Sequence, residues 1–260
     1  MWPSCSGFDM TYDFSGYKVF ISGAGRGLGR ASAVYLAKLG ATVAVSDLDA
    51  ASVSETVAEI RAAGGNAYGY VADLGVRESF LNAAAEFAAA CGPLDAVINN
   101  ASILRYEPIE DVSEETVDLM LGGGLKTALW GTQALLANMD IERGGSIINY
   151  ASPVSFRGYP RTAVYSAVKG AVLALTRVMA AELGPRKVRV NALCPGSVPT
   201  PGAVAYVDPA EYERRAATIP LRRLGRDDDI TRAIAFLLGP DASFINGAVL
   251  NVDGGIVAAG

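Results

Sequence analysis

A glycine-rich segment near the N-terminus constrains the fold more than any other feature of this chain. Residues 22–29 read SGAGRGLG and separate a short apolar β-type run, residues 18–21, from a helical pattern at residues 30–39. Glycines in such a loop let the backbone turn sharply and approach a pyrophosphate, whose negative charge the N-terminus of the following helix stabilises. The loop by itself also suits an ordinary tight turn. Its position between a strand and a helix favours a dinucleotide-binding βαβ unit.

The same alternation of strand and helix continues along the chain. β-type runs at residues 41–46, 67–71, 96–98, 146–150, 188–193 and 249–252 alternate with helical stretches at residues 52–63, 78–90, 113–138, 165–183 and 227–238. This order predicts an α/β fold of the Rossmann type, a doubly wound parallel sheet with helices on both faces. We expect an N-terminal extension at residues 1–14 and a single domain over residues 15–260. The stretch 197–224 is long and weakly periodic, and we interpret it as a substrate loop containing one short helix.

An aspartate at the end of the second strand bears on the choice of cofactor. Asp47 lies about 20 residues after the glycine loop, where a carboxylate accepts hydrogen bonds from the ribose hydroxyls of a bound adenosine. At contact distance that carboxylate would repel a 2′-phosphate by roughly 1 to 4 kcal/mol. The combination predicts NAD(H) rather than NADP(H). Two observations leave the choice open: Arg26 is placed to meet a phosphate, and Asp47 alone would suit a solvated turn.

A tyrosine and a lysine open the long helix predicted at residues 165–183. In the segment YSAVK, Tyr165 and Lys169 are four residues apart and so share one helical face. A free tyrosine has a pKa of about 10, and a neighbouring ammonium group favours the tyrosinate. We expect Tyr165 to exchange a proton with an alcohol or carbonyl oxygen, and Lys169 to lower its pKa and hold the nicotinamide ribose. Ser152, at the end of a strand, is placed to hydrogen-bond the same oxygen. An isolated YxxxK pattern is usually only an amphipathic helix face.

The composition excludes several classes of chemistry. The chain has no histidine, which excludes a Ser-His-Asp hydrolase and a His-ligated metal site. Its three cysteines, Cys5, Cys91 and Cys194, form no CxxC pair, and they fit a reducing, cytoplasmic compartment. The net charge is −5 without a basic stripe for nucleic acid. No apolar run reaches the roughly 20 residues that span a bilayer. We expect no metal, no nucleic-acid partner and no membrane.

Taken in order, these motifs resemble those of the classical short-chain dehydrogenase/reductase family over residues 17–255. The glycine loop is similar to the family's TGxxxGxG, and NNAS at residues 99–102 is similar to NNAG. Ser152 and the Tyr165–Lys169 pair match the catalytic serine and the YxxxK pair. This spacing differs from that of the enoyl reductases of the superfamily. CPGSVPT at residues 194–200 resembles the PG motif, and NVDGG at residues 251–255 resembles the C-terminal strand and turn.

The resemblance implies a function and roles for these positions. It implies hydride transfer between a nicotinamide cofactor and a secondary alcohol or ketone, and a homotetramer assembled through helix pairs and the C-terminal strand region. Asp73 would contact the adenine, Val198 the carboxamide and Thr200 the phosphates. The predicted catalytic residues are Ser152, Tyr165 and Lys169. Motif and resemblance together assign NAD binding to Gly23, Gly25, Arg26, Gly27, Leu28, Asp47, Asp73, Leu74, Asn100, Ala101, Tyr165, Lys169, Pro195, Gly196, Val198 and Thr200.

Two positions depart from the family's pattern. Ser102 replaces the last residue of NNAG, which is a small change. Family members usually carry an asparagine in the helix before the serine strand, where it completes a catalytic tetrad. That position is Gly124 here, within the three glycines of residues 122–124. Three helical glycines cost about 2 to 3 kcal/mol relative to alanine, so we expect a local break in the helix. Our hypothesis is that Gly124 keeps the kink and the main-chain carbonyl, which in the family holds a water bonded to the catalytic lysine.

The substrate is expected between the strand ends and the loop 197–224. Candidate lining residues are mostly apolar or aromatic: Ile103, Arg105, Pro153, Val154, Tyr159, Ala203 and Tyr206. They favour an apolar or cyclic secondary alcohol or its ketone, while arginines 105, 157 and 161 would suit an anionic group or an ordinary surface. Two alternatives remain open. One is a non-catalytic NAD(H)-binding or sensing protein, in which Gly124 marks lost chemistry. The other is an NAD-using epimerase or dehydratase, for which the chain has little C-terminal room.

Overall fold

Seven parallel strands form one sheet in the computed structural model, which describes residues 12–200 and 209–259. The strand order is β3-β2-β1-β4-β5-β6-β7. Their bounds are β1 Lys18–Ser22, β2 Thr42–Asp47, β3 Asn66–Val71, β4 Ala96–Asn99, β5 Gly145–Tyr150, β6 Val188–Pro195 and β7 Val249–Val252. The order reverses between β1 and β4, which pair directly. Such a switch point leaves a crevice at the carboxyl ends of the strands, where ligands of these sheets bind. The predicted fold class is confirmed.

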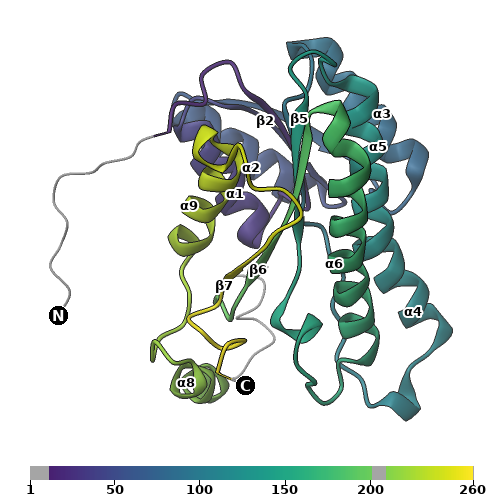
Figure 1. The fold of residues 1–260 in the computed structure, drawn as a ribbon, viewed down its shortest axis with the longest axis vertical. Coiled ribbons are helices and arrows are strands. Elements are labelled where there is room, and N and C mark those ends of the chain that lie inside the picture. The colour runs from purple at the N-terminus through teal and green to yellow at the C-terminus, as the bar shows by residue number, and fades with distance from the viewer. Residues whose placement is uncertain (1–11, 201–208, 260) are drawn as a thin grey trace, which may run out of the picture.

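Helices cover both faces of the sheet (Figure 1). The α-helices are α1 Gly27–Lys38, α2 Ala50–Ala62, α3 Arg77–Cys91, α4 Glu114–Met120, α5 Thr127–Asn138, α6 Ala163–Leu183, α8 Pro209–Thr218 and α9 Asp227–Leu238. Short helical turns are η1 Ile109–Asp111, η3 Pro153–Ser155, η4 Gly184–Arg186 and η5 Pro240–Ala242. Helices α1, α2 and α9 lie on one face, and α3, α5 and α6 on the other (Figure 1).

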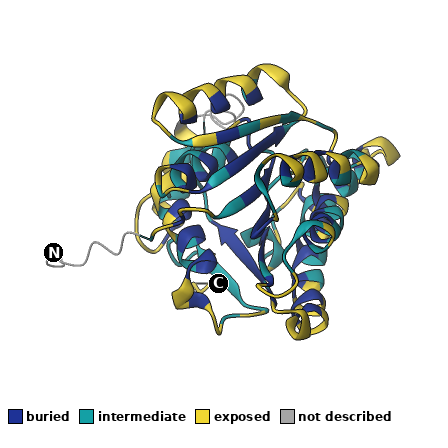
Figure 2. Cartoon of the chain, turned by 90° about the horizontal axis from the view of Figure 1, so that it is seen from above, coloured by how far each residue is buried: buried dark blue, intermediate teal, exposed yellow. Residues whose placement is uncertain are grey.

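The core is divided by the sheet into two apolar clusters. Alternation along β1 illustrates this, because Val19 and Ile21 pack with the α1, α2 and α9 side while Phe20 packs against Phe80 and Phe87 on the other side. All three β1 side chains are fully buried. Figure 2 shows the buried strands at the centre and the exposed residues on the outer surfaces of the helices. Burial on both faces explains why the middle of β1 is an unbroken apolar run from Val19 to Ile21.

The glycine triplet interrupts the helix predicted at residues 113–138. Between α4 and α5 the chain forms a π-helical segment, η2, at Leu121–Lys126. None of the three glycines has a positive φ. The local break predicted from their helix propensity is therefore confirmed, and it takes the form of a wider turn rather than a change of backbone hand. Segments of this kind insert one residue into the helical repeat and are frequent at functional sites.

Helix α6 combines a buried and an outward apolar surface. By length and composition it could cross a membrane, with a mean hydropathy of 1.3 over its most apolar window. Its buried side chains, among them Val172, Leu173 and Thr176, face β5 and β6. Other apolar side chains point outward, and Val178 is 59% exposed. The apolar composition therefore comes partly from the core of the domain and partly from an uncovered outer surface.

Two predicted segments fall partly outside the described residues. The stretch predicted as a loop with one short helix contains α8, while Ala203 and Tyr206 lie in residues 201–208, which the structure does not describe. Residues 1–11 of the predicted extension, including Cys5, are likewise not described. The last residue of that extension, Phe14, is buried in the core, and its amide donates to the carbonyl of Leu39. The packed domain therefore already includes Phe14.

Candidate active site

The glycine-rich loop lies where the strand order reverses, after β1 and before α1. Gly23 and Gly27 have φ values of +65° and +57°, a conformation that favours glycine. A Cβ added at Gly23 would lie 2.8 Å from the Cα of Ala101, and one at Gly29 would overlap the carbonyl oxygen of Gly23. The loop therefore requires glycine at these positions. It forms a tight backbone cradle at a helix N-terminus, and this geometry fits a pyrophosphate.

Asn100 holds this loop in place. Its Nδ2 donates to the carbonyl oxygens of Ser22 and Gly23 at 3.0 and 2.8 Å. In return, the Ser22 hydroxyl accepts hydrogen bonds from the amides of Asn100 and Ala101, each at 3.0 Å. The segment after β4 and the loop after β1 are thus one hydrogen-bonded unit. The sequence reasoning named Asn100 and Ala101 but missed Ser22, whose polar side chain at the end of an apolar strand was the available signal.

The Asp47 carboxylate lies over the glycine loop. Its Oδ2 accepts from the Gly25 amide at 3.1 Å and its Oδ1 accepts from the Leu48 amide at 2.8 Å. A Cβ at Gly25 would lie 3.1 Å from the same Oδ2, and would overlap the hydroxyl of Ser52. The carboxylate is half-exposed beside the first turn of the loop, where it fits an adenosine ribose. Arg26 is the exposed N-cap residue of α1.

The remaining predicted cofactor residues divide into two groups. Thr200 lies on the glycine loop, since its side-chain carbons would be 3.6 to 3.7 Å from a Cβ at Gly27. Pro195 ends β6, and Gly196 fits tightly against Asp253 at the carboxyl edge of the sheet. The other predicted residues differ in how far they are buried. Val198 packs beside Gly225, and Asp73 is exposed after β3. Leu28 is half-buried, and Leu74 is buried in the core. Contact with a cofactor from Leu74 would therefore come from its backbone.

The predicted catalytic residues come together at this same edge. Tyr165 and Lys169 occupy the first two turns of α6, and Ser152 directly follows β5. The Ser152 side chain lies close enough to the Tyr165 hydroxyl to lower its pKa. The ammonium nitrogen of Lys169 lies 5.8 Å from the centre of the Tyr165 ring. The same nitrogen donates to the carbonyl oxygen of Tyr150 at 2.8 Å, and the side chain is buried.

The pKa of Tyr165 is set mainly by burial and not by the neighbouring Lys169. The Tyr165 side chain is half-buried, with its hydroxyl shielded from solvent, and this burial raises the pKa to about 12 against the hydrogen bond from Ser152. Burial lowers the pKa of Lys169 to about 8. The sequence reasoning expected Lys169 to lower the pKa of Tyr165, and the opposite direction is found. Removal from water disfavours the charged form of both groups, and Lys169 is not among the groups that shift the pKa of Tyr165.

Tyr150 was missed by the sequence reasoning although it joins the two halves of the site. Its hydroxyl is 3.2 Å from the hydroxyl of Ser32 in α1, which in turn donates to the carbonyl oxygen of Leu28 at 2.5 Å. Its own carbonyl accepts the hydrogen bond from Lys169. Tyr150 therefore connects the helix behind the glycine loop to the strand that carries Ser152. The signal was an aromatic residue at the end of the strand, two positions before Ser152.

Gly124 packs directly against the helix that carries the lysine. The residue is buried, and a Cβ there would lie 2.5 Å from the Cγ1 of Val168, which precedes Lys169. Its carbonyl oxygen accepts a hydrogen bond from the Thr127 hydroxyl at 2.9 Å. Glycine is therefore required here by the close approach of η2 to α6. The Gly124 carbonyl that the hypothesis needs is engaged by Thr127, and a carbonyl oxygen has a second lone pair for another donor.

The segments that follow β4 and β5 combine exposed apolar side chains with arginines that already have partners. Leu104, Tyr106 and Phe156 are each about half exposed. Arg105 donates to the hydroxyl of Thr116 at 3.2 Å and pairs with Glu115. Arg157 donates to the Ile256 carbonyl at 2.6 Å, and Arg161 lies near the Tyr106 carbonyl. Because these arginines already have partners, the exposed apolar side chains are the main surface that a substrate could contact among the described residues of these segments.

Comparisons with known proteins show what the chain resembles. A family model described as enoyl-(acyl carrier protein) reductase matches residues 23–257. Cyclopentanol dehydrogenase of Comamonas sp. is 35% identical over 242 residues, which cover 92% of this chain and 96% of that enzyme.

Two solved structures are similar to this chain over most of its length. A short-chain dehydrogenase/reductase from Serratia marcescens superposes with a TM-score of 0.89 at 29% identity, over 95% of this chain and 100% of that one. A gluconate 5-dehydrogenase from Burkholderia cenocepacia, in complex with NADP and tartrate, superposes with a TM-score of 0.90 at 31% identity, over 95% of this chain and 98% of that one.

Proposed function

Because the chain belongs to the short-chain dehydrogenase/reductase family, whose members bind a nicotinamide dinucleotide, we propose that it is an NAD(H)-dependent oxidoreductase. Its substrates are an apolar or cyclic secondary alcohol and the corresponding ketone. One observation carries this proposal: Ser152 and Tyr165 lie close enough for the serine to lower the pKa of the tyrosine, at the same sheet edge as the glycine loop, with Lys169 one helical turn away. The matching family model bears the name of an enoyl reductase. The four-residue spacing of Tyr165 and Lys169 is our reason for favouring a carbonyl or alcohol substrate.

The cofactor preference rests on Asp47. The glycine loop would hold the pyrophosphate, and Thr200 lies beside it. Asp47 accepts from the Gly25 amide, so its carboxylate is fixed where an adenosine ribose would reach the loop. A 2′-phosphate there would meet a fixed negative charge, a penalty of roughly 1 to 4 kcal/mol. When bound, the nicotinamide supplies the hydride chemistry.

The protein's own residues would handle the proton. Tyr165, protonated at neutral pH because its pKa is about 12, would donate a proton to a carbonyl oxygen in reduction and accept one in oxidation. Ser152 would hydrogen-bond the same oxygen and orient it. Lys169, held by the Tyr150 carbonyl, would bind the nicotinamide ribose and place positive charge near the tyrosinate that oxidation requires.

We propose that a proton path leads from Lys169 to solvent past the π-helical segment η2. Gly124 supplies a carbonyl but no side chain, so a water at that carbonyl would link Lys169 to solvent without the family's asparagine. Replacing Gly124 by asparagine tests this, provided that Val168 is also made alanine, because a Cβ at 124 would clash with Val168. Turnover of the double variant is compared with that of Val168→Ala alone. Equal turnover supports a functional native path, while a large rise would show that the native path is impaired.

The decisive experiment for the function is a cofactor titration followed by a substrate screen. NADH and NADPH are titrated by fluorescence, and secondary alcohols and ketones are then screened by nicotinamide absorbance. We expect tighter binding of NADH and turnover of apolar cyclic substrates. Tyr165→Phe should abolish turnover and preserve NADH binding, with Tyr68→Phe, in β3 away from the site, as a matched control. Unchanged turnover in Tyr165→Phe would contradict the assignment of the proton donor.

A second candidate is a non-catalytic NAD(H)-binding or sensing protein. Gly124 in place of the family's asparagine favours it, together with a Tyr165 pKa that burial raises to about 12. Tight NADH binding without turnover over a broad alcohol and ketone panel would support this candidate over the enzyme.

The assembly is proposed to be a homotetramer formed through helix pairs and the β7 region. The outward apolar surface of α6, with Val178 59% exposed, supports pairing of this helix with a second copy. Light scattering after size-exclusion chromatography tests the mass. Val178→Asp should dissociate the helix-paired interface, and an unchanged mass would contradict this pairing.

A further inference from the structure

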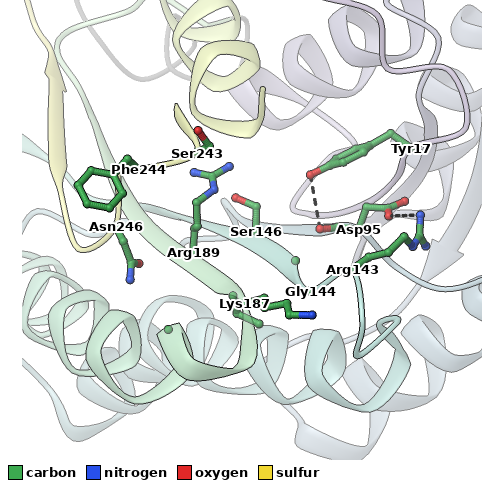
Figure 3. Close-up of a pocket in the computed structure, with 13 residues that line it drawn as sticks. Tyr17, Asp95, Arg143, Gly144, Ser146, Lys187, Arg189, Ser243, Phe244 and Asn246 are labelled. Carbon is green, nitrogen blue, oxygen red and sulfur yellow. Dashed lines mark hydrogen bonds and ion pairs between the residues drawn. The ribbon is translucent and has the colours of Figure 1, made fainter. Parts of the chain in front are cut away.

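A cavity lies at the amino ends of the strands, on the opposite edge of the sheet from Tyr165, and Figure 3 shows the residues that line it. Its volume is about 750 Å³, within the range of small-molecule sites. The starts of β5 and β6 and the segment before β7 contribute to its walls. Ser146 in β5 lines the cavity, whereas Ser152 follows the other end of the same strand, about 20 Å away at the usual rise per residue. The cavity is therefore separate from the candidate active site.

Three basic side chains and one carboxylate line this cavity, in a protein whose net charge is −5. Arg143 pairs through NH1 with Asp95 at 3.1 Å and through Nε with Asp140 at 3.2 Å. Lys187 donates to the carbonyl oxygen of Glu142 at 2.8 Å. Lys187 also pairs with the carboxylate of Glu142 at 3.5 Å, so Arg143 retains NH2 and Lys187 retains one ammonium hydrogen without a partner among the described residues. Both side chains are more than half exposed, so these donors are available to a ligand.

Arg189 forms the inner basic wall. Its NH2 donates to the carbonyl of Leu237 at 2.8 Å, and its NH1 approaches the carbonyl of Ile245 at 3.4 Å. These bonds fix the guanidinium group, while its Nε has no partner among the described residues. A planar cation held in this way keeps its position when a ligand arrives, so little side-chain entropy is lost on binding.

A buried hydroxyl in the same cavity has no partner. Ser146 is 2% exposed, and its Oγ makes no hydrogen bond within the described part of the chain. Figure 3 shows this hydroxyl directed toward the side of the cavity where Arg189 lies. Buried polar groups in folded proteins nearly always have partners. An unsatisfied donor beside three cations is the arrangement expected where an anion completes the hydrogen bonding.

We propose that this cavity binds a small anion, a carboxylate or a phosphate. Arg143, Lys187 and Arg189 supply the positive charge, and Ser146 donates a hydrogen bond to the ligand. Phe244 is fully exposed at the rim and offers an aromatic face, which favours a ligand whose anionic group is attached to a planar ring. Asp95 and Asp140 pair with Arg143, and Glu142 pairs with Lys187, so Arg189 is the one lining cation without a carboxylate partner among the described residues. One anionic group therefore suits the site better than several.

Titration calorimetry with two probes tests this proposal. Inorganic phosphate and benzoate are titrated separately into the full chain saturated with NADH, at constant ionic strength, so that the cofactor site does not contribute. We expect binding of at least one probe with a single site per chain, and the two probes distinguish a phosphate from a carboxylate ligand. Ser146→Ala and Lys187→Gln should each weaken the binding about five- to tenfold.

Matched variants keep the result interpretable. Arg232→Gln removes an exposed charge on α9 whose ion pair with Asp228 has a length of 3.8 Å. It alters the net charge as Lys187→Gln does, and should bind like the wild type. Ser146→Ala removes a buried hydroxyl without a partner and should fold normally, which thermal unfolding checks. Absence of binding by both probes, or equal weakening in Lys187→Gln and Arg232→Gln, would overturn the proposal.

Discussion

The two glycines at either end of the triplet should respond in opposite directions to the same substitution. Nothing lies within 4 Å of a Cβ at Gly122, whereas a Cβ at Gly124 would lie 2.5 Å from the Cγ1 of Val168. Neither glycine has a positive φ, so alanine fits both backbones. Alanine in a helix gains up to about 1 kcal/mol over glycine. Overpacking in a core typically costs about 1 to 3 kcal/mol, since Val168 is β-branched and cannot easily turn away.

These figures give a signed prediction for stability. Gly122→Ala should raise the free energy of unfolding by about 0.5 to 1 kcal/mol, because only the propensity term operates. Gly124→Ala should lower it by about 1 to 2 kcal/mol, the overpacking cost less the propensity gain. For a chain of this size these changes correspond to Tm shifts of about +1 to +4 °C and −2 to −8 °C. Urea denaturation followed by circular dichroism measures both values.

The cause assigned to the loss can be isolated by a double-mutant cycle. In a Val168→Ala background the methyl group that a Cβ at 124 would meet is absent, so Gly124→Ala should become neutral or stabilising. The resulting coupling energy should be at least about 1 kcal/mol. Equal stabilisation by Gly122→Ala and Gly124→Ala, or a coupling energy near zero, would refute the argument that η2 needs glycine for its approach to α6.

Three further predictions concern ionisation and the cofactor. Since burial raises the pKa of Tyr165 to about 12, the rate of alcohol oxidation should rise with pH across the alkaline range, while the rate of ketone reduction stays nearly constant. We would measure pH–rate profiles in both directions. An oxidation rate that is flat above pH 8 would contradict this prediction. Burial lowers the pKa of Lys169 from 10.5 to about 8, so its ammonium form destabilises the fold below pH 8 and this cost disappears as pH rises toward 10.5. Lys169→Met should therefore be more stable than the wild type at pH 7 by up to about 3 kcal/mol, and this difference in stability should shrink above pH 8. Thermal unfolding at several pH values measures the difference. A difference that does not change with pH would exclude the burial of the Lys169 ammonium group as its cause. Asp47→Asn should raise the affinity for NADPH relative to that for NADH by at least about fivefold, because the fixed negative charge is removed. Parallel fluorescence titrations with the two cofactors measure this ratio, and an unchanged ratio would contradict the role of Asp47.

The sequence predicted those parts of the molecule whose causes are local. The inner strands were visible as apolar runs, because a parallel sheet buries both of their faces, whereas the edge strand β3 carries several exposed residues. The glycine loop was visible because its backbone conformation excludes other residues at Gly23 and Gly27. The break at the glycine triplet was likewise a matter of helix propensity, although its π-helical form was not predicted. In each case the residues responsible are neighbours in the sequence.

The parts that could not be predicted depend on contacts between distant segments. The pKa of Tyr165 depends on how deeply its hydroxyl is enclosed, and a four-residue spacing carries no information about this burial. The link from Tyr150 to Ser32 joins residues 118 positions apart. The cavity at the amino ends of the strands brings together Asp95, Ser146 and Arg189 from three strands or their flanks. Only the assembled sheet places these groups side by side.

The contact between Gly124 and Val168 also explains why the departure from the family's asparagine involves more than one residue. An asparagine at 124 would need space that the Val168 side chain fills, and Val168 immediately precedes Lys169 on α6. The two positions therefore form one packing unit: a side chain at 124 requires a smaller residue at 168, and valine at 168 requires glycine at 124. Family members with the asparagine should carry a residue smaller than valine directly before their catalytic lysine. Sequence comparison across the family checks this expectation, and frequent Asn–Val combinations would show that the helices can separate without loss of the fold.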